Sequence, residues 1–240
     1  MGKWVTRCLI SLDHFEKEQV NRKRRYHQAY DQAIRAVKLL HDSNIYTGVT
    51  LCVTDDINSV DKFQQYLDFV CQLGIDEIRI VLPIPQGNLR GKDFRKLYID
   101  VMRWTRDVKK KADMDTSYPN IFLFSQFESE EYMGCGAGYT YLTVNNDGAL
   151  TPCVCVPYSI GNVKEIGLKS AYKQLNDFFK TTGNTCYGRR TAQLLPEQGR
   201  EQVPYPKEVS QDIMSKCIVR DGNAGFFRNI LPEIQNVQGI

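Results

Sequence analysis

Residues 134–153 read GCGAGYTYLTVNNDGALTPC. In this stretch Cys135, Gly148 and Cys153 have the spacing C-x12-G-x4-C. An Asn-Asp-Gly triplet between two short runs with β-branched residues is typical of a hairpin turn. We therefore expect a hairpin over about 139–152 that brings a cysteine before its first strand close to a cysteine after its second. Thiolates held in this way, with further cysteines downstream, indicate an iron–sulfur cluster.

The bulk composition excludes several classes of protein. The chain has 240 residues, 42% hydrophobic and 25% charged, which is typical of a globular protein. A net charge of +3 and a pI near 8.3 give no indication of nucleic-acid binding. No apolar run is long enough to span a membrane, and the N-terminus lacks a signal-peptide pattern. Eight cysteines in such a chain favour metal ligation in the cytoplasm over disulfides.

The region before the hairpin alternates between strand and helix patterns. Strands are expected at 4–12, 47–53 and 77–82, and helices at 26–42, around 60–72 and around 94–108. This order predicts parallel strands with right-handed crossovers. Cys8, Cys52 and Cys71 fall among apolar residues of these elements and are expected in the core.

The second half of the chain has weaker patterns. Residues 112–120 are expected to form a linker, and 121–124 a strand that joins two domains. A short helix is expected around 168–179, residues 191–212 are polar, and 213–231 are expected to fold back on the body. We therefore expect domains at 1–115 and 116–190, and an irregular extension over 191–240.

Several segments outside the hairpin add to the pattern formed by the cysteines. They are the Gly-Asn segment of 157–163, the strand ends at 10–13 and 48–54, the arginine-rich 22–25 and the Pro-x-Gly loop of 83–88. Together with Cys135 and Cys153, they resemble radical S-adenosylmethionine (radical SAM) enzymes that carry a SPASM/Twitch auxiliary domain. The resemblance implies an α/β fold: the second half of a parallel β/α barrel, followed by a small α+β iron–sulfur domain.

The motif that defines this family is absent. The sequence has no C-x3-C-x2-C, whose cysteines hold the SAM-cleaving cluster in the family, and no Gly-Gly-Glu segment. Because the resemblance starts abruptly in mid-barrel, we expect an N-terminally incomplete sequence. A family member that has lost catalysis is the alternative.

The resemblance also implies the ligands of one auxiliary [4Fe–4S] cluster. Cys135 and Cys153 are the first two ligands. Cys186 lies at the position where, in the family, the chain supplies a third ligand after the helix. The fourth is open between Cys217, which we favour, and Cys155, which lies only two residues beyond Cys153. An open iron site with only three cysteines is a further alternative. A zinc site is the chemical rival, although paired C-x2-C knuckles are lacking.

Polar residues at the strand ends are candidates for cofactor binding. Ser11 and Asp13 end the first expected strand, and sites of parallel α/β folds gather at such ends. In the family such groups line the cavity for SAM and substrate, and Arg22 or Arg25 would approach the SAM carboxylate. A turn or helix-cap role is the alternative for Asp13, and a solvated basic cluster for Arg22.

The resemblance implies the carboxyl-terminal part of a radical SAM oxidoreductase or maturase. SAM would serve the complete protein, and a peptide or protein is the implied substrate. This chain alone lacks the SAM-cleaving motif, so a non-catalytic iron–sulfur or zinc module, or a scaffold, is the alternative. An open strand edge at 4–12 also predicts self-association.

Overall fold

The computed structural model describes residues 4–183, 185–195, 203–216 and 224–229. The chain divides into two compact units. The first comprises Met1–Pro83 and Asp93–Phe124, and the second Ile84–Lys92 and Ser125–Ile240. Each has its own hydrophobic core. Among the described residues, no helix is long and apolar enough to cross a membrane.

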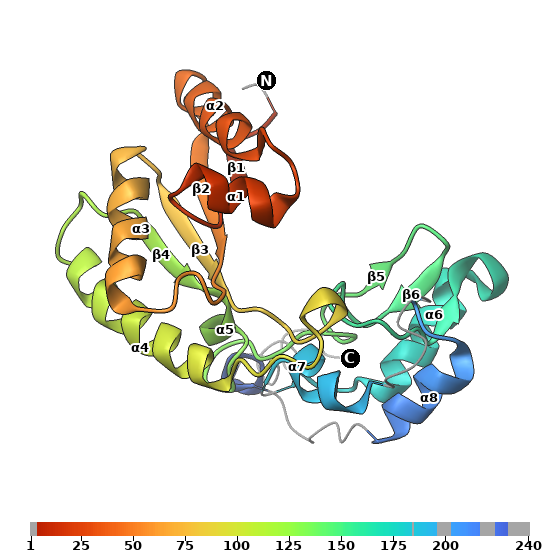
Figure 1. The fold of residues 1–240 in the computed structure, drawn as a ribbon. Helices are drawn as coiled ribbons and strands as arrows, with labels where there is room; N and C mark the ends of the chain where they lie inside the picture. Colours follow the sequence, from red (N-terminus) through yellow and green to blue (C-terminus); the bar gives the residue numbers. More distant parts are fainter. Residues whose placement is uncertain (1–3, 184, 196–202, 217–223, 230–240) are drawn as a thin grey trace. The chain divides into compact units, whose positions relative to one another are not determined.

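The first unit is built on a parallel sheet of four strands in the order β1-β2-β3-β4 (Figure 1). The strands are β1 (Arg7–Ser11), β2 (Tyr46–Cys52), β3 (Glu77–Val81) and β4 (Asn120–Leu123). Sequential order with parallel pairing requires a crossover connection between neighbours, which is usually helical. These helices are α1 (Lys17–Arg24) and α2 (Ala29–Asp42), then α3 (Val60–Gln72), then α4 (Arg95–Ala112). The predicted α/β class with a parallel sheet is thereby confirmed.

The helices form where apolar residues recur at helical spacing. In α3 the buried residues Phe63, Tyr66, Leu67 and Val70 form one face, which packs in the core that also holds strand residues of β2 and β3. The side chain of Ser59 caps its first turn by accepting the N–H of Lys62 at 3.3 Å. Gly74 follows its last turn with φ +68°, a conformation that favours glycine.

Two parts of the first unit differ from expectation. The segment 121–124 was expected to join two domains, but β4 pairs with β3 as the fourth strand of the sheet, so the first unit extends beyond residue 115 to Phe124. The strand expected at 4–12 is the shorter β1, and Trp4 is 90% exposed. Helix α1 was not expected, because it buries a single apolar residue, Val20, and so lacks an apolar stripe.

The second unit contains a small antiparallel sheet, β5-β6-β7 (Figure 1). Its strands are β5 (Thr143–Val144), β6 (Ala149–Thr151) and β7 (Gly161–Asn162). Its helices are η1 (Gly87–Leu89), α5 (Phe124–Phe127, which begins at the last residue of the first unit), α6 (Val163–Phe178), α7 (Tyr187–Thr191), η2 (Ala192–Leu194) and α8 (Lys207–Lys216). Asn162 caps α6 by accepting the N–H of Lys164 at 2.9 Å.

The core of the second unit lies between α6, α7, α8 and the hairpin. Its members include Leu150, Tyr158, Leu175 and Ile213, all essentially inaccessible to solvent. Residues 224–228 also fold back onto this unit, as expected for the segment 213–231. The N–H of Ala224 donates to the Thr182 hydroxyl at 2.9 Å, and the N–H of Gly225 to the Glu130 carbonyl at 2.7 Å.

Candidate metal centre

The hairpin forms as the sequence predicts. Strands β5 and β6 are antiparallel, and the turn closes with the N–H of Gly148 donating to the Asn145 carbonyl at 2.9 Å. Gly148 has φ +92°, and an added Cβ would lie 2.5 Å from the Asn162 side-chain oxygen. The glycine of C-x12-G-x4-C is therefore required both by the backbone conformation and by the close approach of β7.

A second glycine joins the two cysteine-bearing ends of the hairpin. The N–H of Gly138 donates to the carbonyls of Tyr141 and Pro152, each at 2.9 Å. Pro152 directly precedes Cys153, and Gly138 lies three residues after Cys135. This shared donor fixes the loop of the first cysteine against the segment of the second.

The segment around Cys186 closes on the first cysteine from another direction. Cys135 and Gly183 exchange backbone hydrogen bonds of 2.6 and 2.9 Å. The N–H of Tyr187 donates to the Cys135 sulfur at 3.3 Å. The thiols of Cys135 and Cys186 are hydrogen-bonded to each other. The structure thus brings together two of the predicted ligands that lie 51 positions apart (186 − 135).

Several donors converge on the sulfur of Cys153. The N–H of Cys155 lies 3.4 Å from it and the hydroxyl of Tyr141 lies 3.9 Å from it. The thiol of Cys155 is also hydrogen-bonded to it. Hydrogen bonds to a ligating sulfur are one of the means by which a protein sets the reduction potential of a cluster.

The four thiols form two pairs, and within each pair the pKa values shift in opposite directions. A hydrogen bond from Cys155 lowers the pKa of Cys153 to about 6, and the same contact raises the pKa of Cys155 well above its usual value. Likewise, a hydrogen bond from Cys186 lowers the pKa of Cys135, and Cys135 raises that of Cys186. In each pair the sulfur with the lowered pKa loses its proton more readily than its neighbour.

Glu128 adds an acidic group to the same region. Burial, together with the charges of Cys186 and Cys153, raises its pKa to about 8 against a lowering effect of Arg189. Four thiols and a carboxyl therefore share one poorly solvated place, where they cannot all ionise without added positive charge. A metal centre supplies such charge, so the donor set fits an iron–sulfur cluster, whose usual ligands are cysteine thiolates.

The geometry is less suited to a single metal ion. Zinc requires four ligands about 2.3 Å from one point. Within the described ranges, no three His, Cys, Asp or Glu side chains come together closely enough to hold one ion. In a four-iron cluster each thiolate binds its own iron, so the sulfurs surround the cluster without meeting at one point.

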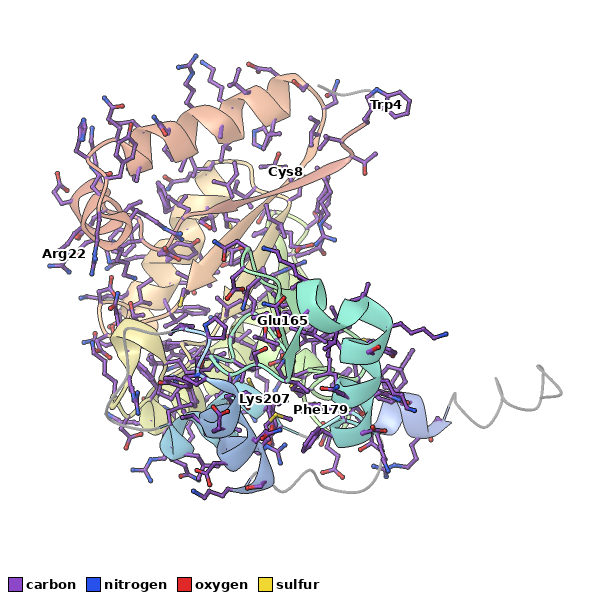
Figure 2. The ribbon with its side chains drawn as sticks, turned by 90° about the vertical axis from the view of Figure 1, so that its right-hand side faces the viewer. Trp4, Cys8, Arg22, Glu165, Phe179 and Lys207 are labelled. Atoms are coloured by element: carbon purple, nitrogen blue, oxygen red, sulfur yellow. The ribbon has the colours of Figure 1, made fainter. Side chains whose placement is uncertain are left out.

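The remaining predicted residues are not brought to this region. Cys217 lies outside the described residues. Ser11 is exposed at the end of β1, and Arg22 projects outward from α1 (Figure 2). Asp13 is 5% exposed; its carboxylate accepts the N–H of Cys52 at 3.0 Å and pairs with Arg24. Its observed contacts are those of a structural residue, and its cofactor role stays a prediction.

The burial of three cysteines and the membership of the site also differ from expectation. The cysteines Cys8, Cys52 and Cys71 are half-buried rather than fully in the core. Glu128 and Tyr141 join the thiols but were not predicted, because neither lies in a spacing that suggests metal chemistry. Cys155, which was the less favoured fourth ligand, lies directly beside Cys153.

Comparison with known proteins gives one family match. Residues 135–188 match SPASM, an iron–sulfur cluster-binding domain. This range begins at Cys135 and includes Cys153, Cys155 and Cys186. The prediction that this region binds an iron–sulfur cluster is confirmed at the level of the domain.

Longer similarities extend over both units. An AdoMet-dependent heme synthase of Oleidesulfovibrio alaskensis is 24% identical over 195 residues, covering 70% of this chain and 50% of its own length. The structure of Streptococcus suis SuiB bound to precursor peptide SuiA is similar with a TM-score of 0.52 at 17% identity, covering 85% of this chain and 53% of SuiB. The structure of anSMEcpe with bound AdoMet has a TM-score of 0.52 at 15% identity, covering 97% of this chain and 66% of anSMEcpe.

These findings confirm the resemblance to radical SAM enzymes with a SPASM domain. The structural similarities, at such low identity, concern the fold alone. The chain spans about half the length of the curated relative and of SuiB.

Proposed function

We propose that this chain is the carboxyl-terminal, cluster-bearing part of a radical SAM oxidoreductase or maturase. Its auxiliary [4Fe–4S] cluster would be held by Cys135, Cys153 and Cys186 together with a fourth ligand. The observation that carries the proposal is the meeting of thiols from three separate segments within the residues that match the SPASM domain.

A bound cluster would supply one-electron chemistry and a site where substrate can coordinate. The chain's own residues hold and polarise its ligands. The N–H groups of Tyr187 and Cys155 donate to the sulfurs of Cys135 and Cys153 and stabilise their thiolate forms. Gly138 and the Cys135–Gly183 pair keep the three segments in place. Partial burial of the cysteines limits access of water and oxidants.

The proposal extends to SAM and to a peptide substrate. SAM would be bound by the complete protein near the carboxyl ends of β1–β4, where the end of a parallel sheet provides a site. Ser11, Asp13 and Arg22 remain its proposed contacts. A peptide or protein substrate is supported by the SuiB structure, which was determined with its precursor peptide.

Two further parts of the proposal concern the chain as a whole. Its seven described cysteines are all outside disulfides, which supports the reducing cytoplasm. In the described residues β1 pairs with β2 alone, so one edge of the sheet carries backbone groups free for pairing. We propose that this edge promotes association with another chain.

The alternative is a non-catalytic module that binds a cluster or zinc. It is favoured by the lack of C-x3-C-x2-C, since this chain by itself cannot assemble the SAM-cleaving cluster. Metal content distinguishes a zinc module from a cluster module. Adding the SAM-cleaving half distinguishes a non-catalytic cluster module from part of an enzyme, because only the latter would regain turnover.

The test is anaerobic reconstitution with iron and sulfide, followed by measurement of iron, sulfide and zinc per chain. We expect about four iron and four sulfide, as for one [4Fe–4S] cluster. Cys135→Ala should lose them, whereas Cys71→Ala, a half-buried cysteine in α3, should not. Zinc in place of iron, or iron retained by Cys135→Ala, would contradict the proposal.

A further inference from the structure

We propose that Cys155 provides the fourth thiolate of the auxiliary cluster, in place of the more distant Cys217. This inference deepens the proposed function and rests on it. Binding to the fourth iron would release the proton of the Cys155 thiol to solvent. Four ligands would then come from three segments: Cys135, the Cys153–Cys155 pair and Cys186.

The backbone after Cys153 bends in a way that keeps Cys155 at the site. The N–H of Val156 donates to the Cys153 carbonyl at 3.1 Å, which closes a turn over residues 153–156. Within this turn the Cys155 N–H lies 3.4 Å from the Cys153 sulfur, and the two thiols are hydrogen-bonded. The turn thus holds Cys155 beside Cys153, although only one residue separates the two cysteines.

The same turn lies against the segment of the third ligand. An added Cβ at Gly188 would lie 3.5 Å from the Cys155 carbonyl oxygen, so the start of α7 lies close to the backbone of Cys155. Gly188 is two residues after Cys186, and Gln86 fixes it by donating to its carbonyl at 3.0 Å. The Cys155 thiol also interacts electrostatically with Cys186 and Glu128. Cys155 therefore lies beside the segment that carries Cys186.

The described residues of the second unit offer few other candidates. Their cysteines are Cys135, Cys153, Cys155 and Cys186, so Cys155 is the one described thiol there without a proposed role. Glu128 is the carboxylate rival, because its carboxyl interacts electrostatically with Cys186 and Cys153. Thiolate is the usual ligand of a four-iron cluster, which favours Cys155 over Glu128.

The first experiment compares Cys155→Ser, Cys217→Ser and Glu128→Gln with the wild type after anaerobic reconstitution. Each protein is oxidised with ferricyanide, and its iron content and electron paramagnetic resonance spectrum are recorded. An iron without a protein thiolate is released as Fe²⁺ while the cluster gives one electron to ferricyanide, leaving a three-iron cluster. We expect Cys155→Ser to lose about one quarter of its iron and to show the three-iron signal. The other two variants should behave like the wild type.

A second measurement needs no variant and so does not depend on the variant folding. Cysteines of the wild type are alkylated with iodoacetamide before and after loading with iron and sulfide, and the sites are identified by mass spectrometry. We expect loading to abolish alkylation of Cys155 along with the three other ligands, and to leave Cys217 reactive.

The outcomes are distinct. Protection of Cys217 with continued alkylation of Cys155 would overturn the inference, as would the three-iron signal in Cys217→Ser or Glu128→Gln instead of Cys155→Ser. Equal behaviour of the wild type and all three variants would also overturn it, since the fourth iron would then have no ligand among them. Failure of the wild type to take up iron and sulfide would instead refute the proposed function itself.

Discussion

Replacing Gly138 by alanine tests whether this glycine holds the hairpin ends together. Gly138 has φ +73°, a left-handed conformation that costs an alanine about 1–2 kcal/mol. The added Cβ would lie 2.4 Å from the ring of Phe179, which is 3% exposed and packs on Tyr187. Overpacking of this kind typically costs a further 1–3 kcal/mol, roughly. We therefore expect the second unit to lose about 2–5 kcal/mol of unfolding free energy.

Gly167 is a matched control for the backbone contribution. It has φ +75° within α6, in the same unit, and no atom lies within 4 Å of an added Cβ. Gly167→Ala should therefore cost only about 1–2 kcal/mol. The difference between the two variants isolates the contact with Phe179, which lies at the end of α6 (Figure 2).

Urea unfolding with two probes resolves the two units. The chain has two tryptophans, Trp4 and Trp104, both in the first unit, so their fluorescence follows that unit. Hydrogen exchange of peptides from 163–178 follows the second. We expect Gly138→Ala to increase exchange in this helix far more than Gly167→Ala and to lower iron uptake. Equal effects of the two variants, or full iron uptake by Gly138→Ala, would refute the reasoning.

Two predictions concern the first unit. Asp13→Asn keeps an acceptor for the N–H of Cys52 but removes the charge paired with Arg24. We therefore expect the unfolding free energy, measured by tryptophan fluorescence in urea, to fall by about 1–3 kcal/mol. No loss, or an equal loss in the control Asp55→Asn at an exposed position, would contradict the structural role of Asp13. Burial lowers the pKa of His14 below its usual 6.5, so the unfolded chain binds the proton more readily, and stability should fall as the pH drops below about 6.5. His14→Gln should weaken this pH dependence, and an unchanged dependence would exclude His14 as its source.

The elements predicted well from the sequence depend on local patterns. Helices α3 and α4 were expected because apolar residues recur at helical spacing, and the hairpin because its Asn-Asp-Gly triplet tolerates the positive φ angles of a tight turn. Helix α1 lacks both kinds of signal, since it buries Val20 alone. Strand β4 has only four residues, too few for their apolar alternation to predict a pairing partner. Its pairing with β3 in the structure assigns it to the first unit.

The sequence by itself determined that the chain has a strand–helix half, a cysteine hairpin and at least two thiols suited to a cluster. These features follow from spacing along the chain. The tertiary structure alone decided that Cys186 meets Cys135, that Cys155 turns back onto Cys153 and that Glu128 joins them. Such contacts depend on how distant segments fold together, through backbone bonds such as those between Cys135 and Gly183, and no spacing in the sequence encodes them directly.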